Sequence, residues 1–218
     1  MEKTLSILDE LGETFPSPSE ITPHLIHKEL MATNYQCILT KQDVMKTPRL
    51  TDERKLWTMR FMNCLLRCLF STAPMVMPLV ACRMGALSLD FGYCSDNAMG
   101  YMAYSHAVLN VTQDIDACYQ WARTSLSFPE RFDLSLLPKV KLFFYAYMAV
   151  WKEPIQACCD IILKIKEDLL MVGDIESAVI AIFNHSRQSL FSGNELTAAE
   201  KVCSSGMAMM VSILRKFY

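Results

Sequence analysis

Apolar residues recur mostly at intervals of three and four along the chain, and no stretch alternates apolar and polar residues for long. The first spacing is typical of a helix with an apolar face, whereas alternation is typical of a strand. The pattern therefore predicts an all-α protein of about nine or ten helices joined by short turns, without a sheet. The expected helices span residues 2–11, 20–39, 51–70, 74–91, 97–109, 115–128, 138–151, 154–170, 175–191 and 196–216.

Local signals mark several helix ends. Gly12 and Gly92 follow apolar helical stretches and are expected to terminate them. Thr51 is expected to cap the helix 51–70, and Asp174 the helix that begins at Ile175. The second half of 51–70 is apolar nearly all round, which predicts deep burial. Residues 41–50, which include Pro48, are expected to form a polar break.

The stretch from Asn97 to Pro129 predicts a helix-turn-helix unit with the organisation of a tetratricopeptide repeat, which is about 34 residues long. Small residues in such a unit lie where the two helices cross, and large residues fill the spaces between units. The positions that carry this pattern are Tyr101, Tyr104, Ser105 and Val108 in the first helix, Ala117, Trp121 and Thr124 in the second, and Pro129, which is expected to end the unit. The aromatic residues among them are interpreted as packing residues.

Similar hairpins are expected around Gly92, Gly173-Asp174 and Gly193. The sequence thus predicts an α-solenoid of degenerate tetratricopeptide-like hairpins. We expect one domain over residues 1–218, with less regular helices in 1–50 and the hairpin array in 51–218. Because the turns are unevenly spaced, an irregular helical bundle stays open as the alternative.

Composition narrows the class of function. The chain has 218 residues, 52% of them hydrophobic, which favours helices buried on more than one side. The net charge of -2 supplies no basic excess for phosphate, and this argues against a nucleic-acid partner. The longest uninterrupted apolar run, residues 142–151, is shorter than the roughly 20 residues that a helix needs to cross a bilayer.

The cysteines and histidines offer candidate chemistry. We interpret the cysteines in apolar helical stretches as buried, reduced thiols, which indicates a cytosolic or nuclear compartment, and we expect a cytoplasmic protein. These are Cys64, Cys68, Cys82, Cys118, Cys158, Cys159 and Cys203. The pairs His24/His27 and Cys64/Cys68 have spacings that two metal ligands could use, but a metal site needs three or four ligands, so no metal is expected.

A family resemblance is carried by the Phe91-Gly92 turn, the small and tyrosine residues of 98–105, and the acidic turn at Gln113-Asp114. The later Gly173-Asp174 turn continues it, with Ala178, Asn184 and His185 in the helix that follows. This pattern resembles the tetratricopeptide-like helical region of large signalling ATPases of the AAA (STAND) class. In that family the region lies between an ATPase module and output domains such as histidine kinases or nucleotide cyclases, and many members carry a Ser/Thr kinase domain.

The chain itself has no GxxxxGK[ST] phosphate loop and no kinase motif. The resemblance therefore implies a non-catalytic scaffold, without a cofactor or catalytic residue, whose partner is a peptide or a neighbouring protein domain. The alternative is a free-standing all-α enzyme or small-ligand bundle. His106 and His185 are the candidate bases for it, and a deep pocket holding His185 with two carboxylates would favour it.

Overall fold

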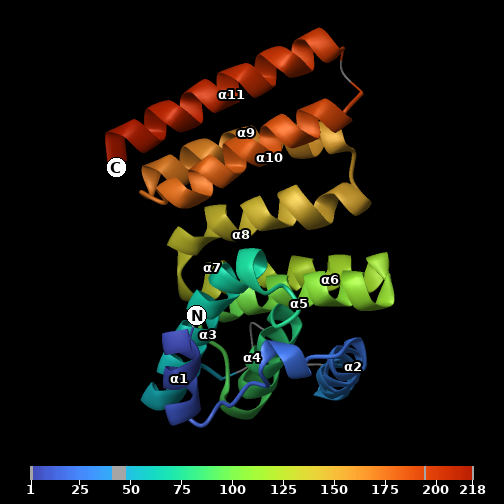
Figure 1. Cartoon of the computed structure of the whole chain (residues 1–218), viewed down its shortest axis with the longest axis vertical. Coiled ribbons are helices and arrows are strands. Elements are labelled where there is room, and N and C mark those ends of the chain that lie inside the picture. Colours follow the sequence, from blue (N-terminus) through green and yellow to red (C-terminus); the bar gives the residue numbers. More distant parts are fainter. Residues whose placement is uncertain (1, 41–47, 194, 218) are drawn as a thin grey trace. The chain divides into compact units, whose positions relative to one another are not determined.

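The computed structural model describes residues 2–40, 48–193 and 195–217, and this part of the chain is helical, with turns and one isolated backbone bridge between Arg49 and Tyr93 but no strand (Figure 1). The all-α class predicted from the apolar spacing is confirmed. Most of the expected polar break at 41–50, namely residues 41–47, lies outside the described residues. The described residues group into two compact units, Met1–Leu134 and Ser135–Tyr218.

The elements of the first unit are α1 (Glu2–Glu10), the 3₁₀ turn η1 (Pro18–Glu20), α2 (Pro23–Thr40), α3 (Glu53–Thr72), α4 (Met77–Phe91), α5 (Asn97–Thr112), α6 (Ile115–Ser125) and α7 (Ser127–Phe132). Helix α5 is the central one, because it packs against α4 and α6 and also contacts α2, α3 and α7. A further 3₁₀ turn, η2 (Leu134–Leu136), lies at the boundary between the units.

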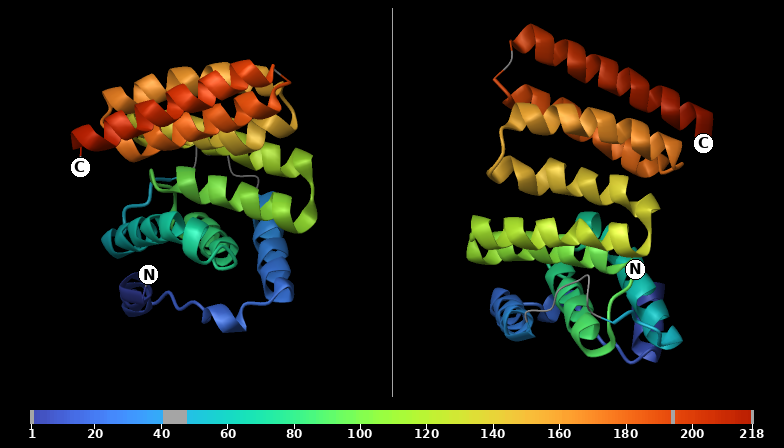
Figure 2. Two further views of the ribbon diagram at one scale, coloured as in Figure 1. Left: turned by 45° about the horizontal axis from the view of Figure 1, so that its top comes forward. Right: turned by 180° about the vertical axis from the view of Figure 1, so that it is seen from behind.

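The second unit is a row of neighbouring helices: α8 packs on α9, α9 on α10, and α10 on α11, as Figures 1 and 2 show. Its elements are α8 (Leu137–Phe143), the π-helical segment η3 (Phe144–Met148), the 3₁₀ turn η4 (Ala149–Trp151), α9 (Ile155–Met171), α10 (Ile175–Phe191) and α11 (Leu196–Phe217). The core buries Leu142, Ala146, Ile162, Ile165, Leu169, Ala178 and Ala181. A solenoid over the whole chain would require one continuous stack of helices through both units. The predicted solenoid therefore stays a prediction.

Where local chemistry sets a helix end, the sequence and the structure agree. Helix α10 begins at Ile175, and the Asp174 carboxylate accepts a hydrogen bond from the Ser177 amide at 3.0 Å, as expected of an N-cap. Gly92 ends α4 with a φ of 100°. A Cβ at Gly92 would stand 2.6 Å from the carbonyl oxygen of Pro48. Both the positive φ and the lack of space for a side chain therefore require glycine at this position.

Two expected helix starts are displaced. Asp52, rather than Thr51, caps α3, and its carboxylate accepts from the Lys55 amide at 3.0 Å. Helix α4 begins at Met77, and Pro78, rather than Pro74, occupies its first turn. In each case a neighbouring residue takes the expected role: Thr and Asp both have a side-chain oxygen that can cap a helix, and either proline could stand in a first turn.

Pro129 was expected to end the helix after the Asp114 turn, and this expectation is wrong. Helix α6 ends at Ser125, and Pro129 lies inside the short helix α7. A proline is tolerated in a first helical turn because the amide that it lacks has no intrahelical acceptor there.

The second half of α3 was expected to be buried all round, which is also wrong. Cys64 and Cys68 are exposed, and the Phe70 side chain is 48% exposed. Helix α3 packs with α4 and α5 on one side and with α1 beside it, so a further face stays in solvent.

The expected continuous helix to Trp151 changes geometry after Phe143, where the backbone becomes π-helical and then 3₁₀. Polar side chains of α10 donate hydrogen bonds to backbone carbonyl groups of this segment. Gln188 Nε2 donates to the Tyr145 oxygen at 3.0 Å and to the Ala146 oxygen at 3.2 Å, and Arg187 Nη2 donates to the Ala146 oxygen at 3.0 Å. Long-range side-chain donors therefore stabilise this departure from α geometry.

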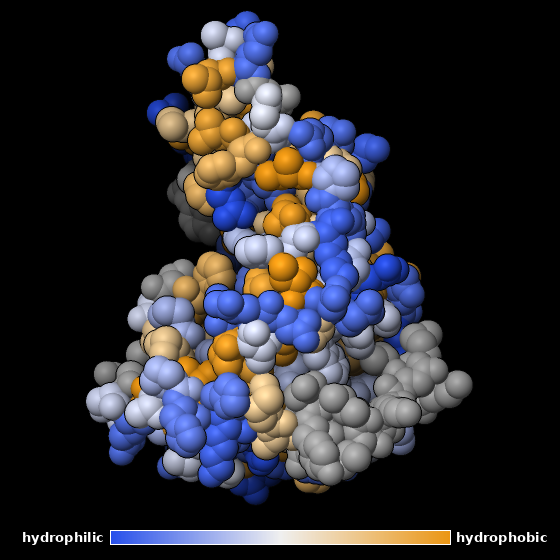
Figure 3. All heavy atoms as spheres, turned by 90° about the vertical axis from the view of Figure 1, so that its right-hand side faces the viewer, coloured by the Kyte–Doolittle hydropathy of each residue, from blue (hydrophilic) through white to orange (hydrophobic). Residues whose placement is uncertain are grey.

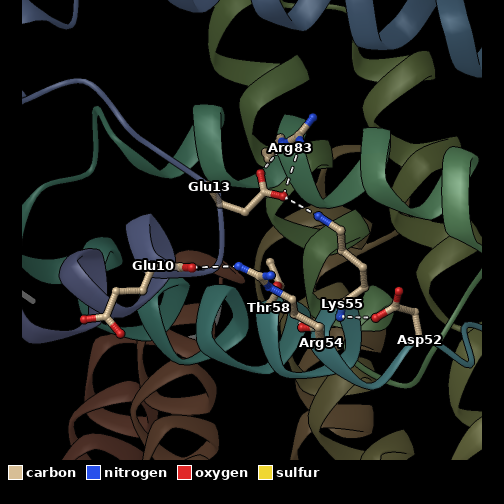
Figure 4. A network of polar contacts seen from close by, with 7 residues as sticks. All are labelled: Glu10, Glu13, Asp52, Arg54, Lys55, Thr58 and Arg83. Atoms are coloured by element: carbon tan, nitrogen blue, oxygen red, sulfur yellow. Dashed lines mark hydrogen bonds and ion pairs between the residues drawn. The ribbon is translucent and has the colours of Figure 1, made fainter.

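A carboxylate with two cationic partners attaches the segment after α1 to α3 and α4 (Figure 4). The Glu13 side chain is 2% exposed, accepts from Lys55 Nζ at 3.0 Å and pairs with both Arg83 Nε and Nη2. Burial raises the pKa of Glu13, but the hydrogen bonds from Arg83 and Lys55 outweigh burial and hold the pKa below its ordinary value. Arg54 adds a hydrogen bond of 2.8 Å to the carbonyl oxygen of Glu10.

Replacing Glu13 with glutamine is expected to lower the free energy of unfolding at neutral pH by about 1–3 kcal/mol, because two cations lose a buried counter-charge. The folded-state pKa of Glu13 is lowered, so its contribution is present above the ordinary carboxyl pKa and is lost as the pH falls through the folded value. Urea unfolding at several pH values should therefore show the difference between wild type and E13Q shrinking on acidification. The exposed Glu130→Gln serves as the control. A difference that is independent of pH would contradict this account.

Candidate functional site

The eight repeat-signature residues lie on α5, α6 and α7, and their aromatic members pack together. The Tyr101 and Tyr104 rings lie 5.8 Å and 5.2 Å from the Trp121 ring, and Tyr101 lies 5.0 Å from Phe128. The two tyrosines are buried, and the Tyr104 hydroxyl donates to the carbonyl oxygen of Leu30 on α2. These side chains thus join α5 to α6, α7 and α2.

The non-aromatic signature residues of α5 and α6 differ in burial. Ser105 and Val108 are buried on α5, whereas Ala117 and Thr124 on α6 are half-buried. Ala117 is in the first turn of α6, where its amide donates to the Asp114 carboxylate at 2.9 Å. Ser105 is fully buried, and its hydroxyl donates to the carbonyl oxygen of Met102 at 2.7 Å.

Gly206 marks a close helix crossing that the sequence analysis missed. It is buried on α11, and a Cβ there would stand 2.6 Å from Ser186 Oγ and 3.2 Å from Ile182 Cγ2 of α10. The sequence does contain one sign of this crossing, a glycine inside a helical stretch, because such a glycine usually has a role in packing. Ser186 Oγ is buried without a hydrogen-bond partner among the described residues.

A hollow of the first unit lies beside His106. It encloses about 750 Å³ between α2, α5 and the start of α4, with prolines, methionines and Phe70 in its lining. The His106 ring meets Phe70 edge to face at 6.4 Å, and burial lowers the pKa of His106 to about 4. His106 is therefore neutral at neutral pH, and His27 is the other ionisable residue among the described lining.

A smaller hollow of about 240 Å³ lies beside His185 in the second unit, between α9, α10 and α11. Among the described residues, its ionisable lining consists of Lys166 and His185, without a carboxylate. Burial lowers the pKa of His185, and the charge of Asp160 opposes that shift. The two carboxylates that would favour a His185-based enzyme site are therefore not part of the described lining.

The cysteines are not uniformly buried. Cys82, Cys118, Cys158 and Cys159 are buried, but Cys64 and Cys68 are exposed and Cys203 is half-buried, which corrects the expectation for the α3 pair. Burial raises the pKa of Cys158 to about 11, so this thiol stays protonated at neutral pH.

The histidine pair His24/His27 lies on the exposed part of α2. Within the described residues, no three or more His, Cys, Asp or Glu side chains gather closely enough to hold a metal ion. In the same residues, no helix combines the length and the apolar character that a membrane span requires.

Several large apolar side chains of the second unit lie in solvent. On α10, Phe183, Leu190 and Phe191 are 56%, 49% and 70% exposed. On α11, Leu196 and Met207 are 77% and 63% exposed. Figure 3 shows hydrophobic surface at the level of these two helices.

No protein-family model, no curated protein and no solved structure matches the chain. The resemblance to the helical region of signalling ATPases therefore stays a prediction.

Replacing Ser105 with leucine is expected to lower the free energy of unfolding by about 1–3 kcal/mol, because the larger side chain has no space at a fully buried position. Ala117→Leu should cost less, because Ala117 is only half-buried. Thermal or urea unfolding of both variants tests this order. If neither substitution changed the stability, the result would contradict the close packing described for α5.

Gly206 and Ser186 should be energetically coupled. Gly206→Ala alone is expected to destabilise the protein, because the new methyl group meets Ser186 Oγ. Ser186→Ala should be neutral or stabilising, because it removes a buried hydroxyl that has no hydrogen-bond partner among the described residues. A double-mutant cycle by urea unfolding should then give a favourable coupling of about 0.5–2 kcal/mol. Additive effects would contradict the crossing geometry.

Proposed function

We propose that this chain is a non-catalytic helical scaffold that binds a protein partner, either a peptide or a neighbouring domain, in the cytoplasm. The supporting observation is the distribution of apolar side chains on α10. Its inner face buries the small residues Ala178 and Ala181, whereas Phe183 and Phe191 stand in solvent. Exposed clusters of large apolar residues are typical of protein-interaction surfaces.

The energetic reason is the hydrophobic effect. Removing apolar surface from water is favourable by about 25 cal/mol per Å², so exposed phenylalanines contribute little to this chain's own folding. Their burial in a complex would instead favour association. The geometry of α10 thus suits a surface that a second polypeptide covers.

The signalling part of the proposal comes from the sequence resemblance. A helical region between an ATPase or kinase module and an output domain would contact both and transmit a change between them. A free-standing enzyme or small-ligand protein is the second candidate. The hollow beside His185 favours the scaffold over that candidate, because its described lining offers one lysine and one histidine but no acid.

The double substitution Phe183→Ser and Phe191→Ser tests the scaffold. Because both residues are exposed, the midpoint of thermal unfolding should stay nearly unchanged. We expect the wild-type chain, purified under native conditions from its own cells, to elute with a defined second polypeptide, and the variant to elute alone. Glu176→Ser, an exposed position on the same helix, is the control. Equal retention of the second polypeptide by wild type and variant would contradict the role of this surface.

A further inference from the structure

The hollow beside His106 has the size and depth of a small-molecule site. The start of α2, the end of α3, the connection from α3 into the first turn of α4, and the second half of α5 all contribute to its lining. Ile26 and Met77 are buried at its floor, whereas Phe70 and Met75 are 48% and 49% exposed at its rim. Its volume of about 750 Å³ is within the range of about 300–1,000 Å³ that is usual for ligand pockets.

The described lining of this hollow contains no aspartate, glutamate, lysine or arginine. Burial lowers the pKa of His106 to about 4, so this ring is neutral at neutral pH. Among the described residues, no charged side chain contributes to that shift, which places His106 in apolar surroundings. A charged ligand would lose its water shell here without gaining an opposite charge, and this favours an uncharged ligand.

The apolar side chains of the lining favour an aromatic ligand in particular. Met75 and Met77 both lie in the lining, and thioether sulfur makes favourable contacts with aromatic rings. Methionine is also flexible, so it can adapt its shape to a flat ring. Phe70 adds an aromatic ring of its own, which meets the His106 ring edge to face at 6.4 Å.

Three prolines stiffen the walls of the hollow. Pro23, Pro74 and Pro78 are all in the described lining, and the proline ring fixes the backbone angle φ. A wall that is already ordered loses little conformational entropy when a ligand binds. The site is therefore largely formed before the ligand arrives.

Asn110 supplies a polar group that can orient a ligand at this hollow. Its Nδ2 donates a hydrogen bond of 2.8 Å to the carbonyl oxygen of His106, one turn earlier on α5. The amide oxygen of asparagine is an acceptor with two lone pairs. A ligand with an N–H or O–H group is therefore favoured.

We propose that the hollow beside His106 binds an uncharged aromatic small molecule that carries one hydrogen-bond donor. The aromatic body would lie against Met75, Met77 and Phe70, and the donor would face the Asn110 amide oxygen. This inference goes beyond the scaffold function, because it assigns a small ligand to the first unit, whereas the apolar surface of α10 belongs to the second.

Two fluorescent probes with the same ring system test the requirement for an uncharged ligand. N-phenyl-1-naphthylamine is uncharged and has one N–H group, and 8-anilinonaphthalene-1-sulfonate adds a sulfonate to it. Titration of the full chain at neutral pH should show saturable binding of N-phenyl-1-naphthylamine. The sulfonate should bind at least about tenfold more weakly, because its charge has no counter-charge in the described lining.

Competition against bound N-phenyl-1-naphthylamine tests the aromatic preference. 4-Phenylphenol, which is uncharged with one O–H group, should displace the probe at lower concentration than 1-decanol, which has an O–H group but no ring. Equal displacement by the two alcohols would contradict the aromatic ligand.

Substitutions in the lining locate the probe. Val111 is half-buried on α5, so Val111→Trp should fill the hollow and weaken N-phenyl-1-naphthylamine binding at least about tenfold. Asn110→Ala should weaken it by about two- to tenfold, as expected for one hydrogen bond. Val211→Trp, the same change at an exposed position of α11, is the matched control. The midpoint of thermal unfolding identifies a variant that has lost its fold.

Methionine oxidation gives a second measurement on the unmodified chain. N-phenyl-1-naphthylamine should slow the oxidation of Met75 by hydrogen peroxide, read by mass spectrometry of the digested protein. Met171, which is 78% exposed on α9, should be oxidised at an unchanged rate.

Equal affinities for the uncharged and the sulfonated probe, or an unchanged rate of Met75 oxidation, would overturn the proposal. Probe binding that persists in Val111→Trp but is lost in the double variant Phe183→Ser and Phe191→Ser would also overturn it, because it would assign the probe to the surface of α10. Retention of probe binding by that double variant is the expected result. Failure of the ligand proposal leaves the partner test on α10 intact, because the two tests concern different residues in different units.

Discussion

Close approach of helices through small side chains is the constraint on which both units depend. Ser105 is completely buried on α5, Ala178 and Ala181 lie in the core beneath α10, and Gly206 lets α11 approach Ser186 and Ile182. When the inner positions are small, little apolar volume is available between the helices. The larger apolar residues of α10 then stand on its other side, and this is how a well-packed unit comes to expose Phe183.

The first unit adds an electrostatic attachment to this packing. Glu13 follows α1 in the chain, and its two cationic partners come from α3 and α4. The segment that carries Glu13 is not helical, so it cannot be held by helix packing alone. A buried carboxylate without those partners would be strongly unfavourable, and the pairing therefore defines where α1 lies against α3.

The elements best predicted from the sequence are those whose ends depend on neighbouring residues. Helices α9 and α10 lie where expected because Pro154, Gly173 and Asp174 act locally. The exposure of Cys64 and Cys68 was not predictable in this way, since apolar spacing shows that a helix has an apolar face but not which partner covers it. The short helix α7 was missed because Pro129 is compatible with both a helix end and a first turn. Gly206 shows its role only when α10 is placed beside it.

The candidate sites, too, could be predicted from the sequence only in part. The sequence identified His106 and His185 as candidate bases, and both lie beside hollows. The lining of each hollow depends on how several helices pack together, so neither the missing acid beside His185 nor the burial of His106 could be anticipated.

The π-helical segment Phe144–Met148 has a consequence for the length of the chain. A π turn behaves as an α-helix that has gained one residue, and every position beyond it is rotated by about 100°. Deleting one residue there would remove the π turn and rotate the indole of Trp151 about the helix axis. The same deletion would leave Arg187 and Gln188 facing carbonyl groups that are already engaged along the backbone. The number of residues in this segment and the donor side chains of α10 are therefore linked, and a shorter relative of this chain would be expected to differ at both.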